Sequence, residues 1–571
     1  MTDVREPATR RREPRVAADS PRYRWVALSN TTLGMLMATI NSSIVLISLP
    51  AIFRGISLDP LAPGNVSYLL WMLMGFLLVT AVLVVSLGRL GDIYGRVRVY
   101  NLGFVVFTVA SIALFVDPLT GGPGALWLII WRVVQGVGGA MIFANSTAIL
   151  TDAFPADRRG LALGVNQVAA IAGSFLGLIL GGVLAEVDWR LVFLVSVPVG
   201  IAGTIWSYLS LHEQGIRTQA RVDWWGNVLF GVGLTAVLTG ITYGIQPYSG
   251  HDMGWTNPWV LVALVGGTGL LAVFCVVETR VEAPMFDLSL FRIRAFVAGN
   301  LAGWLAAIAR GGLQFMLIIW LQGIWLPLHG FSFESTPLWA GIYLVPLTLA
   351  FLVAGPLSGA LSDRHGARAF ATGGLLLTGV SFAGLLLLPT DFPYWAFALL
   401  IALNGIGSGL FSSPNSTAIM NSVPAGRRGV AAGMRGTFFN SGATLSIGLF
   451  FSLMIIGLAA TLPSTLDHGL LAHHVPDQVA AQVAQAPPVA TLFAAFLGYN
   501  PMRTLLGPDV LGSLTASDRS ALTGHQFFPQ LIEGPFHHGL VIVFALAIGM
   551  TLVASAASAL RGARYVHEDT P

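Results

Sequence analysis

Charge of every kind is scarce in this sequence, and lysine is missing altogether. All 30 basic residues are arginine, and charged residues make up 10% of the 571 positions, against about 25% in a soluble domain. A single cysteine excludes an intramolecular disulfide. Hydrophobic residues reach 55%, and the mean hydropathy is +0.74. The composition therefore excludes a soluble globular protein and indicates one that lies in a lipid bilayer.

Motifs of several other function classes are absent as well. The sequence has no Walker phosphate-binding loop, so this chain alone does not pump with ATP. It has no cluster of His, Asp and Glu of the kind that a membrane-embedded enzyme needs at a membrane face. The pairs His473–His474 and His537–His538 lack the spacing of metal ligands. We therefore predict that the protein is not an enzyme, holds no cofactor or metal, and binds no nucleic acid.

Fourteen apolar stretches are long enough to cross a bilayer, which takes about 20 residues each. With a cytoplasmic N-terminus, the outer connections would keep only Arg54, Arg190, Arg503 and Arg519. This asymmetry follows the positive-inside rule, so we predict a multi-pass protein of the plasma membrane with both termini cytoplasmic. The stretches lie near 25–50, 67–88, 99–116, 125–150, 161–185, 190–211, 224–245, 257–278, 295–322, 337–361, 369–389, 393–420, 429–460 and 538–560.

Three segments fall outside the spans. Residues 1–24 are charged and contain proline, which predicts a disordered cytoplasmic tail, and residues 561–571 form a second short tail. Residues 461–536 form a long extracytoplasmic loop. Its apolar stretch PPVATLFAAFLGYNPMRTLLGP is broken by Pro and Gly, so we expect it to pack on the outer mouth or to lie in the membrane interface. Loops of this length usually have a task; contact with an envelope partner and guarding of a lipid exit path are the two hypotheses.

An internal repeat explains the number fourteen. The sequence NSTAI occurs at Asn145–Ile149 and again 270 positions later at Asn415–Ile419, and GRLGDIYGRVR from Gly88 pairs with GALSDRHGARA from Gly359. The repeat predicts an all-α membrane protein with six-helix bundles at 25–211 and 295–560 and two inserted central helices at 224–278. Halves related by an axis along the membrane normal place a substrate site near the midplane between them.

The repeated loop resembles the signature loop of the major facilitator superfamily. WRVVQGVGGA around Arg132 resembles the arginine-containing motif of the fourth helix, and WRLVFLVSVPVG at 189–200 is similar to a segment of the fourteen-span drug:proton antiporters of actinobacterial type. The resemblance implies multidrug efflux of hydrophobic or amphiphilic small molecules, hence antibiotic resistance, by alternating access and proton antiport. It further implies a conformational switch formed by Gly88, Asp92, Gly95, Arg96, Arg98, Gly359, Asp363, Gly366 and Arg368. In the fifth span it implies close packing at the antiporter-motif residues Gly173, Gly177, Gly181 and Gly182.

The first span departs from the family pattern. Where the family usually reads LDxTxVNxALP, this chain has INSSIVLISLP, so Asn41 replaces the acidic residue. No Asp or Glu lies in the interior of any predicted span. The alternative to a proton-coupled drug exporter is therefore an exporter of lipids or glycolipids to the outer leaflet, with atypical or no proton coupling. The remaining candidates for a proton carrier are the outer-end acids Asp59, Glu186, Asp188 and Glu334.

Three arginines, Arg132, Arg310 and Arg435, lie well inside predicted spans. A central arginine costs about 2.5–3.5 kcal/mol on insertion scales, so it usually faces the bundle interior or water. One interpretation is an electropositive cavity for an anionic or amphiphilic substrate, or a proton relay through Arg132. The other is that each arginine binds helix-terminal carbonyls or reaches the membrane interface. The residues predicted for the cavity and for coupling are Asn41, Arg132, Gln135, Arg310, Gln314 and Asn440.

Overall fold

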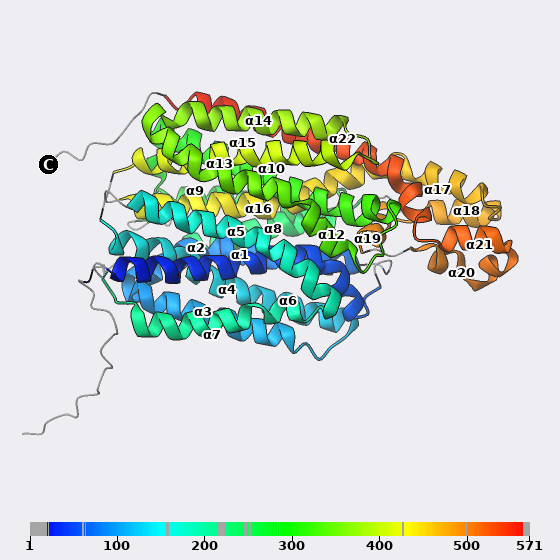
Figure 1. Ribbon diagram of the computed structural model, residues 1–571, viewed down its shortest axis with the longest axis horizontal. Helices are drawn as coiled ribbons and strands as arrows, with labels where there is room; N and C mark the ends of the chain where they lie inside the picture. The colour runs from blue at the N-terminus through cyan, green and yellow to red at the C-terminus, as the bar shows by residue number, and fades with distance from the viewer. Residues whose placement is uncertain are drawn as a thin grey trace, which may run out of the picture.

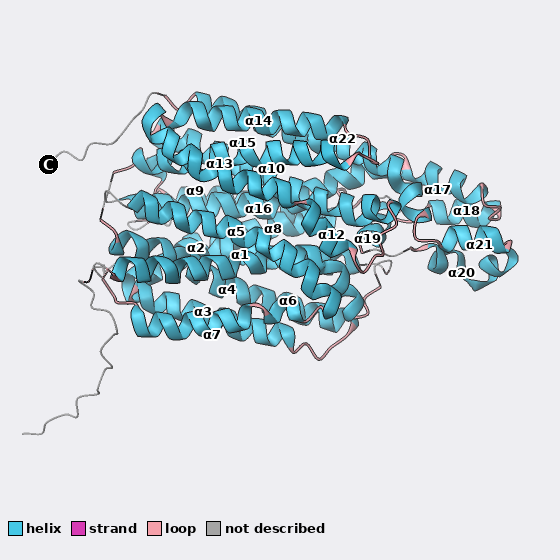
Figure 2. Cartoon of the chain, in the orientation of Figure 1, coloured by secondary structure: helices cyan, strands magenta, loops and turns pink. Residues whose placement is uncertain are grey.

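The computed structural model describes residues 20–562 except 21, 60–61, 63, 156–158, 215–222, 245, 247, 250–252, 282–283, 285, 425–426 and 498–499. The predicted tails, 1–24 and 561–571, lie almost entirely outside these residues. Figure 2 shows that the described chain consists of helices joined by loops.

Within the described residues, fourteen helices or joined helices are long and apolar enough to cross a bilayer, the number that the sequence predicts. The first six spans are α1 (Tyr23–Gly55), α2 (Asn65–Tyr94), α3 (Arg96–Phe115), α4 (Gly121–Ala153), α5 (Arg159–Val187) and the pair α6 (Leu191–Leu194) and α7 (Ser196–Ser210). The next two are α8 (Trp224–Gly244) and α9 (Pro258–Glu278).

The last six spans begin with a helix that changes type along its length. A π-helical segment η2 (Leu321–Trp325) follows α10 (Arg294–Trp320) and leads into α11 (Leu326–Leu328), while a 3₁₀ turn η1 (Leu288–Arg292) precedes α10. Pro327 has no N–H to donate, which removes a hydrogen bond of a regular α-helix at this place. The other spans are α12 (Thr336–Tyr343) with α13 (Val345–His365), α14 (Ala367–Leu387), α15 (Tyr394–Asn421), α16 (Arg428–Ala459) and α22 (Phe527–Ala559).

The spans run side by side along the long axis of the molecule (Figure 1). Helices α1–α7 pack on one another and are called the first bundle; α10–α16 together with α22 do the same and are called the second bundle. The inserted α8 and α9 pack against each other, and α8 also contacts α2 and α16, so it touches both bundles. The start of α1 and the end of α22 lie at the same end of the molecule, called here the terminal end.

The segment 461–536 differs from the loop that the sequence analysis expects. It forms α17 (Leu462–Leu471), α18 (Asp477–Ala484), α19 (Pro488–Phe496), α20 (Met502–Ser513) and α21 (Ala516–Thr523), and α22 begins eleven residues before the predicted span. Leu462, Leu466 and Leu470 recur at helical spacing and are all buried, because α17 packs on α18 and α22. We call α17–α21 the cap. Most of it projects from the end opposite the terminal end, called here the cap end (Figure 1).

The glycines of the fifth span lie against α1. A β-carbon at Gly177 would overlap Ser43 Oγ and lie 2.5 Å from the Ile40 carbonyl oxygen, and one at Gly173 would lie 2.8 Å from the Leu36 carbonyl oxygen. Since these are backbone atoms of a neighbouring helix, the two helices can approach this closely only without side chains here. Gly181 packs on α1 in the same way, and Gly182 lies against Leu338 of the second bundle.

Gly177→Ala is expected to lower the midpoint temperature of thermal unfolding, because overpacking costs about 1–3 kcal/mol. The matched control is Gly266→Ala on α9, where nothing lies within 4 Å of an added β-carbon; there alanine should be neutral or stabilise the helix by about 0.5–1 kcal/mol. Both variants can be unfolded in detergent and followed by tryptophan fluorescence. Equal shifts in the two variants would contradict the close contact between α1 and α5.

Candidate functional site

Arg132 lies at the centre of a buried polar network inside the first bundle. Its Nη1 donates to Gln135 Oε1 at 2.8 Å, to the Asn41 carbonyl oxygen at 3.3 Å and to Asn41 Oδ1. The guanidinium carbon lies 4.7 Å from the centroid of the Phe76 ring. These partners belong to α1, α2 and α4, so one side chain connects three helices. Only 1% of Arg132 is exposed, and a guanidinium buried to this degree requires such acceptors.

The network extends to two further helices through serine hydroxyls. Asn41 Nδ2 donates to Ser196 Oγ on α7 at 3.1 Å, and Gln135 Nε2 donates to Ser111 Oγ on α3 at 2.8 Å. Each amide thus turns its oxygen toward Arg132 and its nitrogen toward a serine. All acceptors of Arg132 are neutral amide or backbone oxygens. Asn41, at the position of the family's acid, therefore supplies a dipole to the arginine but no neutralising charge.

The other two arginines have neutral contacts of a different kind. Arg310 is half-buried on α10, with its guanidinium carbon 5.0 Å from the centroid of the Phe351 ring. Arg435 on α16 donates through Nη1 to Ser416 Oγ at 3.2 Å. Gln314 and Asn440 are half-buried, and within the described residues neither side chain bonds to an arginine. The structure therefore brings Asn41, Arg132 and Gln135 together and leaves the other predicted cavity residues outside their network.

The first copy of the switch loop carries a charged cluster at the terminal end. Arg96 lies 2.7 Å from Asp92 Oδ1 and 2.5 Å from Asp152 Oδ1. Gly95, with φ +113°, turns the chain from α2 into α3, a conformation that glycine adopts without strain. The sequence analysis did not single out Asp152; its place a few residues after NSTAI, at the end of α4, is the signal that could have found it. The cluster joins α2, α3 and α4 and so fixes the loop within the first bundle.

The remaining residues of this loop contact neighbouring helices. A β-carbon at Gly88 would lie 3.5 Å from Ala144 Cβ, so this glycine faces α4. The backbone N–H of Arg98 donates to Glu213 Oε1 at 2.9 Å, which places a carboxylate at the N-terminus of α3, where the helix dipole favours it.

The second copy of the loop keeps the turn but not the cluster. Gly366 has φ +89°, matching Gly95, and a β-carbon at Gly359 would lie 2.6 Å from Ser413 Oγ. Arg368 is exposed, and the side chain of Asp363 lies outside the described residues. At the positions that correspond to Arg96 and Asp152 the repeat has Ala367 and Ser422. The second copy therefore cannot form the same three-residue cluster.

A buried arginine stands beside the second NSTAI motif instead. Arg561 donates through Nη2 to Asn415 Oδ1 and, at 3.2 Å, to Ser558 Oγ. Burial lowers the pKa of Arg561 to about 10, because removal from water disfavours the charged form. The side chain still holds its proton at neutral pH.

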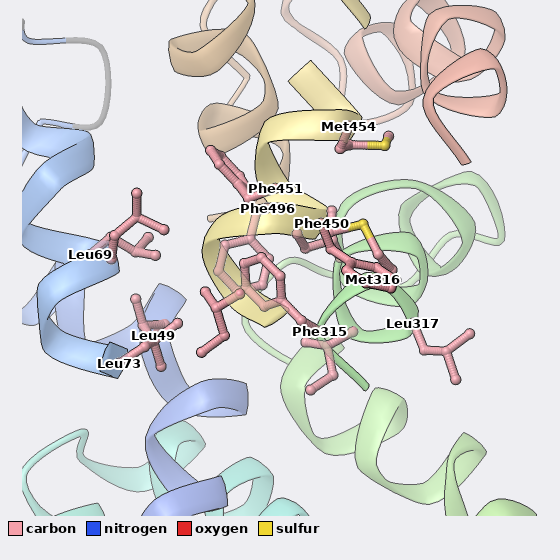
Figure 3. Packing of buried hydrophobic residues seen from close by; sticks show 14 of the residues in the cluster. Leu49, Leu69, Leu73, Phe315, Met316, Leu317, Phe450, Phe451, Met454 and Phe496 are labelled. Carbon is pink, nitrogen blue, oxygen red and sulfur yellow. The ribbon is translucent and has the colours of Figure 1, made fainter. Parts of the chain in front are cut away.

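Helix α19 of the cap lies between the two bundles. Eight of its nine residues are buried and Ala490 is half-buried. The helix contacts α2 of the first bundle and α16 and η2 of the second. The Phe493 ring lies 5.0 Å from that of Phe451, tilted by 55°, and the Phe496 ring lies 6.3 Å from that of Phe315, measured between centroids. Figure 3 shows Phe496 with Phe315 and Phe451, on the side that faces Leu49, Leu69 and Leu73. An apolar helix thus fills the space between the bundles at the cap end.

Direct contacts between the bundles close the same end. Gln322 Nε2 on η2 donates to the Ile47 carbonyl oxygen of α1 at 3.2 Å. A β-carbon at Gly182 would lie 2.5 Å from Leu338 Cα, which brings α5 and α12 together. The structure therefore represents a conformation in which the cap end is sealed.

The four acids suggested as proton carriers, Asp59, Glu186, Asp188 and Glu334, are all exposed. Other acids are buried. Asp117, in the α3–α4 connection, is 1% exposed, and burial raises the pKa of its carboxyl group. Asp223 directly precedes α8 and Glu278 is the last residue of α9, both at the terminal end of the molecule. They are 7% and 3% exposed. The sequence analysis passed over these three because they stand at span ends, where acids are usually solvated.

Comparison with known proteins identifies the family to which this architecture belongs. The sequence model of the family described as the Major Facilitator Superfamily matches residues 31–447. The chain belongs to the major facilitator superfamily. This confirms the predicted membrane fold and the family, so the chain is a secondary transporter and not an enzyme. The solved structure of a peptide transporter, POT, in complex with sulfate has a TM-score of 0.54 at 16% identity, covering 90% of this chain and 98% of the other; it supports the fold alone.

Relatives with reported activities cover most of the chain. The Multidrug resistance protein Stp of Mycobacterium tuberculosis (strain CDC 1551 / Oshkosh) is 30% identical over 81% of this chain and 81% of its own. The Tetracenomycin C resistance and export protein of Streptomyces glaucescens is 28% identical over 82% and 84%. The Riboflavin transporter RibZ of Clostridioides difficile is 27% identical over 76% and 88%. These transporters handle different molecules, so the matches indicate the transport class rather than one substrate.

Proposed function

We propose that this transporter exports hydrophobic or amphiphilic small molecules by alternating access, coupled to the proton gradient, with the cap end facing outward. The relatives named for multidrug resistance and for tetracenomycin C export support the direction and the broad substrate class. The sealed cap end supports alternating access, because a transporter of this fold must close one mouth while the other is open.

The arginines inside the spans determine the substrate preference. Arg132 has only neutral acceptors, and Arg310 contacts an aromatic ring, so the interior keeps positive charge that no described carboxylate of the spans neutralises. In a medium of low dielectric this field extends over several ångströms. It favours an anionic or neutral amphiphile over a cation of the same size.

Export of a lipid or glycolipid is the second candidate. The cap favours it, since α19 places a largely apolar helix at the mouth between the bundles, where an acyl chain would pass. The plasma membrane remains the proposed location in both cases, with the chain termini on the cytoplasmic side.

The test is transport by the purified chain in proteoliposomes with an imposed pH gradient. An anionic dye, a cationic dye of similar size and a fluorescent phospholipid are compared side by side. Faster movement of the anionic dye, driven by the gradient, is the expected result. Equal rates for both dyes would contradict the electropositive interior, transport of the phospholipid alone would favour the second candidate, and indifference to the gradient would remove proton coupling.

A further inference from the structure

Two carboxyl groups lie against each other at the base of the inserted helices. Asp223 precedes α8, and Glu278 ends α9. Asp223 Oδ1 accepts from the Gly226 N–H at 2.8 Å, and Glu278 Oε2 accepts from the Phe286 N–H at 2.9 Å. The other two oxygens, Asp223 Oδ2 and Glu278 Oε1, converge on Gly226: a β-carbon there would overlap the first and lie 2.5 Å from the second. Glycine at this position lets the two carboxyl groups meet.

The two facing oxygens are buried, and neither accepts a hydrogen bond from any donor in the described part of the chain. Because both oxygens lie within 2.5 Å of the position that a β-carbon of Gly226 would take, the two carboxyl groups are close to each other. Two ionised carboxylates repel each other strongly at such a separation where water is excluded, because both oxygens are acceptors and carry like charge. A proton on one of them turns the repulsion into a hydrogen bond.

Aromatic rings keep water from this pair. Phe230 follows Gly226 by one turn of α8, and Phe274 precedes Glu278 by one turn of α9. The two rings are 5.4 Å apart, and Phe286 lies 5.8 Å from the first and 5.6 Å from the second between centroids. Since Phe286 also donates its backbone N–H to Glu278, the ring cluster adjoins the carboxyl pair.

One cation balances the pair when a single proton is bound. Arg89 of α2 interacts electrostatically with both Asp223 and Glu278 and donates to the Pro284 carbonyl oxygen. With one proton the three groups are neutral together; without it they carry one net negative charge in a dry site, which is costly. Arg89 stands in the first copy of the switch loop, three residues before Asp92.

Other ionisable groups around the pair are few. On α9 the Cys275 thiol interacts electrostatically with Glu278. On α2 the Asp92 carboxylate interacts electrostatically with Arg89. Arg435 of α16 bonds to Ser416 instead, and Asp287 pairs with Arg427 at 3.0 Å. Three further charged residues of the adjoining connections, Arg217, Arg221 and Glu282, lie outside the described residues.

We propose that Asp223 and Glu278 hold one proton between them and are the site at which the transporter binds and releases its coupling proton. The step is a proton transfer: the O–H bond of the shared carboxyl group breaks, the proton passes to water at the terminal end, and both carboxylates are left ionised. The extra negative charge then acts on Arg89 and so on the switch loop. Coupling by this pair rests on the proposed proton-driven transport, whereas the shared proton itself does not.

The first test concerns the proton. Infrared difference spectra of the full-length protein in detergent, recorded between about pH 5 and pH 9, should contain one protonated-carboxyl band that disappears as the pH rises. The band should be lost in Glu278→Gln and in Asp223→Asn, and retained in Asp287→Asn, a carboxylate variant of the same terminal end. Persistence of the band in both pair variants, or its absence from the wild type, would overturn the shared proton.

The second test concerns coupling. In Glu278→Gln the amide donates to Asp223 and imitates the protonated pair, so the fold should be kept. Accumulation of substrate driven by a pH gradient should fall at least tenfold, while exchange without a gradient stays near the wild-type rate. If a variant lacks the protonated-carboxyl band but still accumulates substrate in response to the pH gradient, coupling depends on another site. If the wild type ignores the gradient but shows the band, the proposed proton-driven function fails while the shared proton stands.

Discussion

Arg132→Ala is expected to abolish transport and to destabilise the first bundle. The substitution leaves Asn41 Oδ1 and Gln135 Oε1, both fully buried, without their donor. Each unpaired buried acceptor costs about 1–3 kcal/mol, so the free energy of unfolding should fall by about 2–6 kcal/mol. The measurements are thermal unfolding in detergent and substrate transport in proteoliposomes, both compared with the wild type.

Asn41→Asp separates the charge of Arg132 from its hydrogen bonds. The new carboxylate keeps the geometry of Asn41 and neutralises the guanidinium with a charge-assisted bond. It should therefore raise the unfolding temperature while reducing the preference for an anionic over a cationic dye. Arg132→Lys serves as the control, because it retains the charge but not the forked donor geometry. An unchanged dye preference in Asn41→Asp would show that Arg132 does not influence the substrate.

Phe493→Asp in α19 is expected to open the cap end. Phe493 is buried against Phe451, and an unpaired carboxylate costs several kcal/mol in such a place, so the helix should leave the space between the bundles. The readout is a cysteine placed at Leu69, a fully buried residue of α2, in a Cys275→Ser background. A membrane-impermeant maleimide should modify it at least tenfold faster in the Phe493→Asp variant.

The matched control introduces the same charge elsewhere on the cap. Leu471, at the end of α17, is 36% exposed, so Leu471→Asp places a carboxylate in water and should leave the labelling rate unchanged. If Phe493→Asp labels no faster than this control, α19 is not the seal. If both variants label rapidly, the cap as a whole unfolds, and the assignment to α19 alone fails.

The contacts of the site could be predicted only in part. Arg132 is visible in the sequence as a charge inside an apolar span, and Asn41 as a departure from a familiar motif. That one bonds to the other across 91 positions follows from the packing of α1 on α4, which no local pattern specifies. In the same way, the sequence shows Asp223 and Glu278 only as acids at helix ends, where solvation is expected. Their burial depends on the chain folding back so that Phe286 covers Glu278.

The cap shows a second limit of sequence reasoning. Its helices are 8 to 12 residues long, too short to form alone in water, and prolines interrupt the apolar pattern. They form because each buries an apolar face against a neighbour, as α17 does against α18 and α22. Hydropathy showed that the α19 segment is apolar, but its place between the bundles required the arrangement of α2, α16 and η2.

The sequence by itself determined the number of spans, their helical nature, the internal repeat and the family. It could do so because a bilayer offers no hydrogen bonds, so each crossing must be one long apolar helix that satisfies its own backbone. The tertiary structure alone decided that the first bundle holds an arginine with neutral partners, that an apolar helix seals the cap end, and that the acid before α8 meets the acid at the end of α9. These features depend on side chains far apart in the chain, and their partners are set by which helix faces pack together.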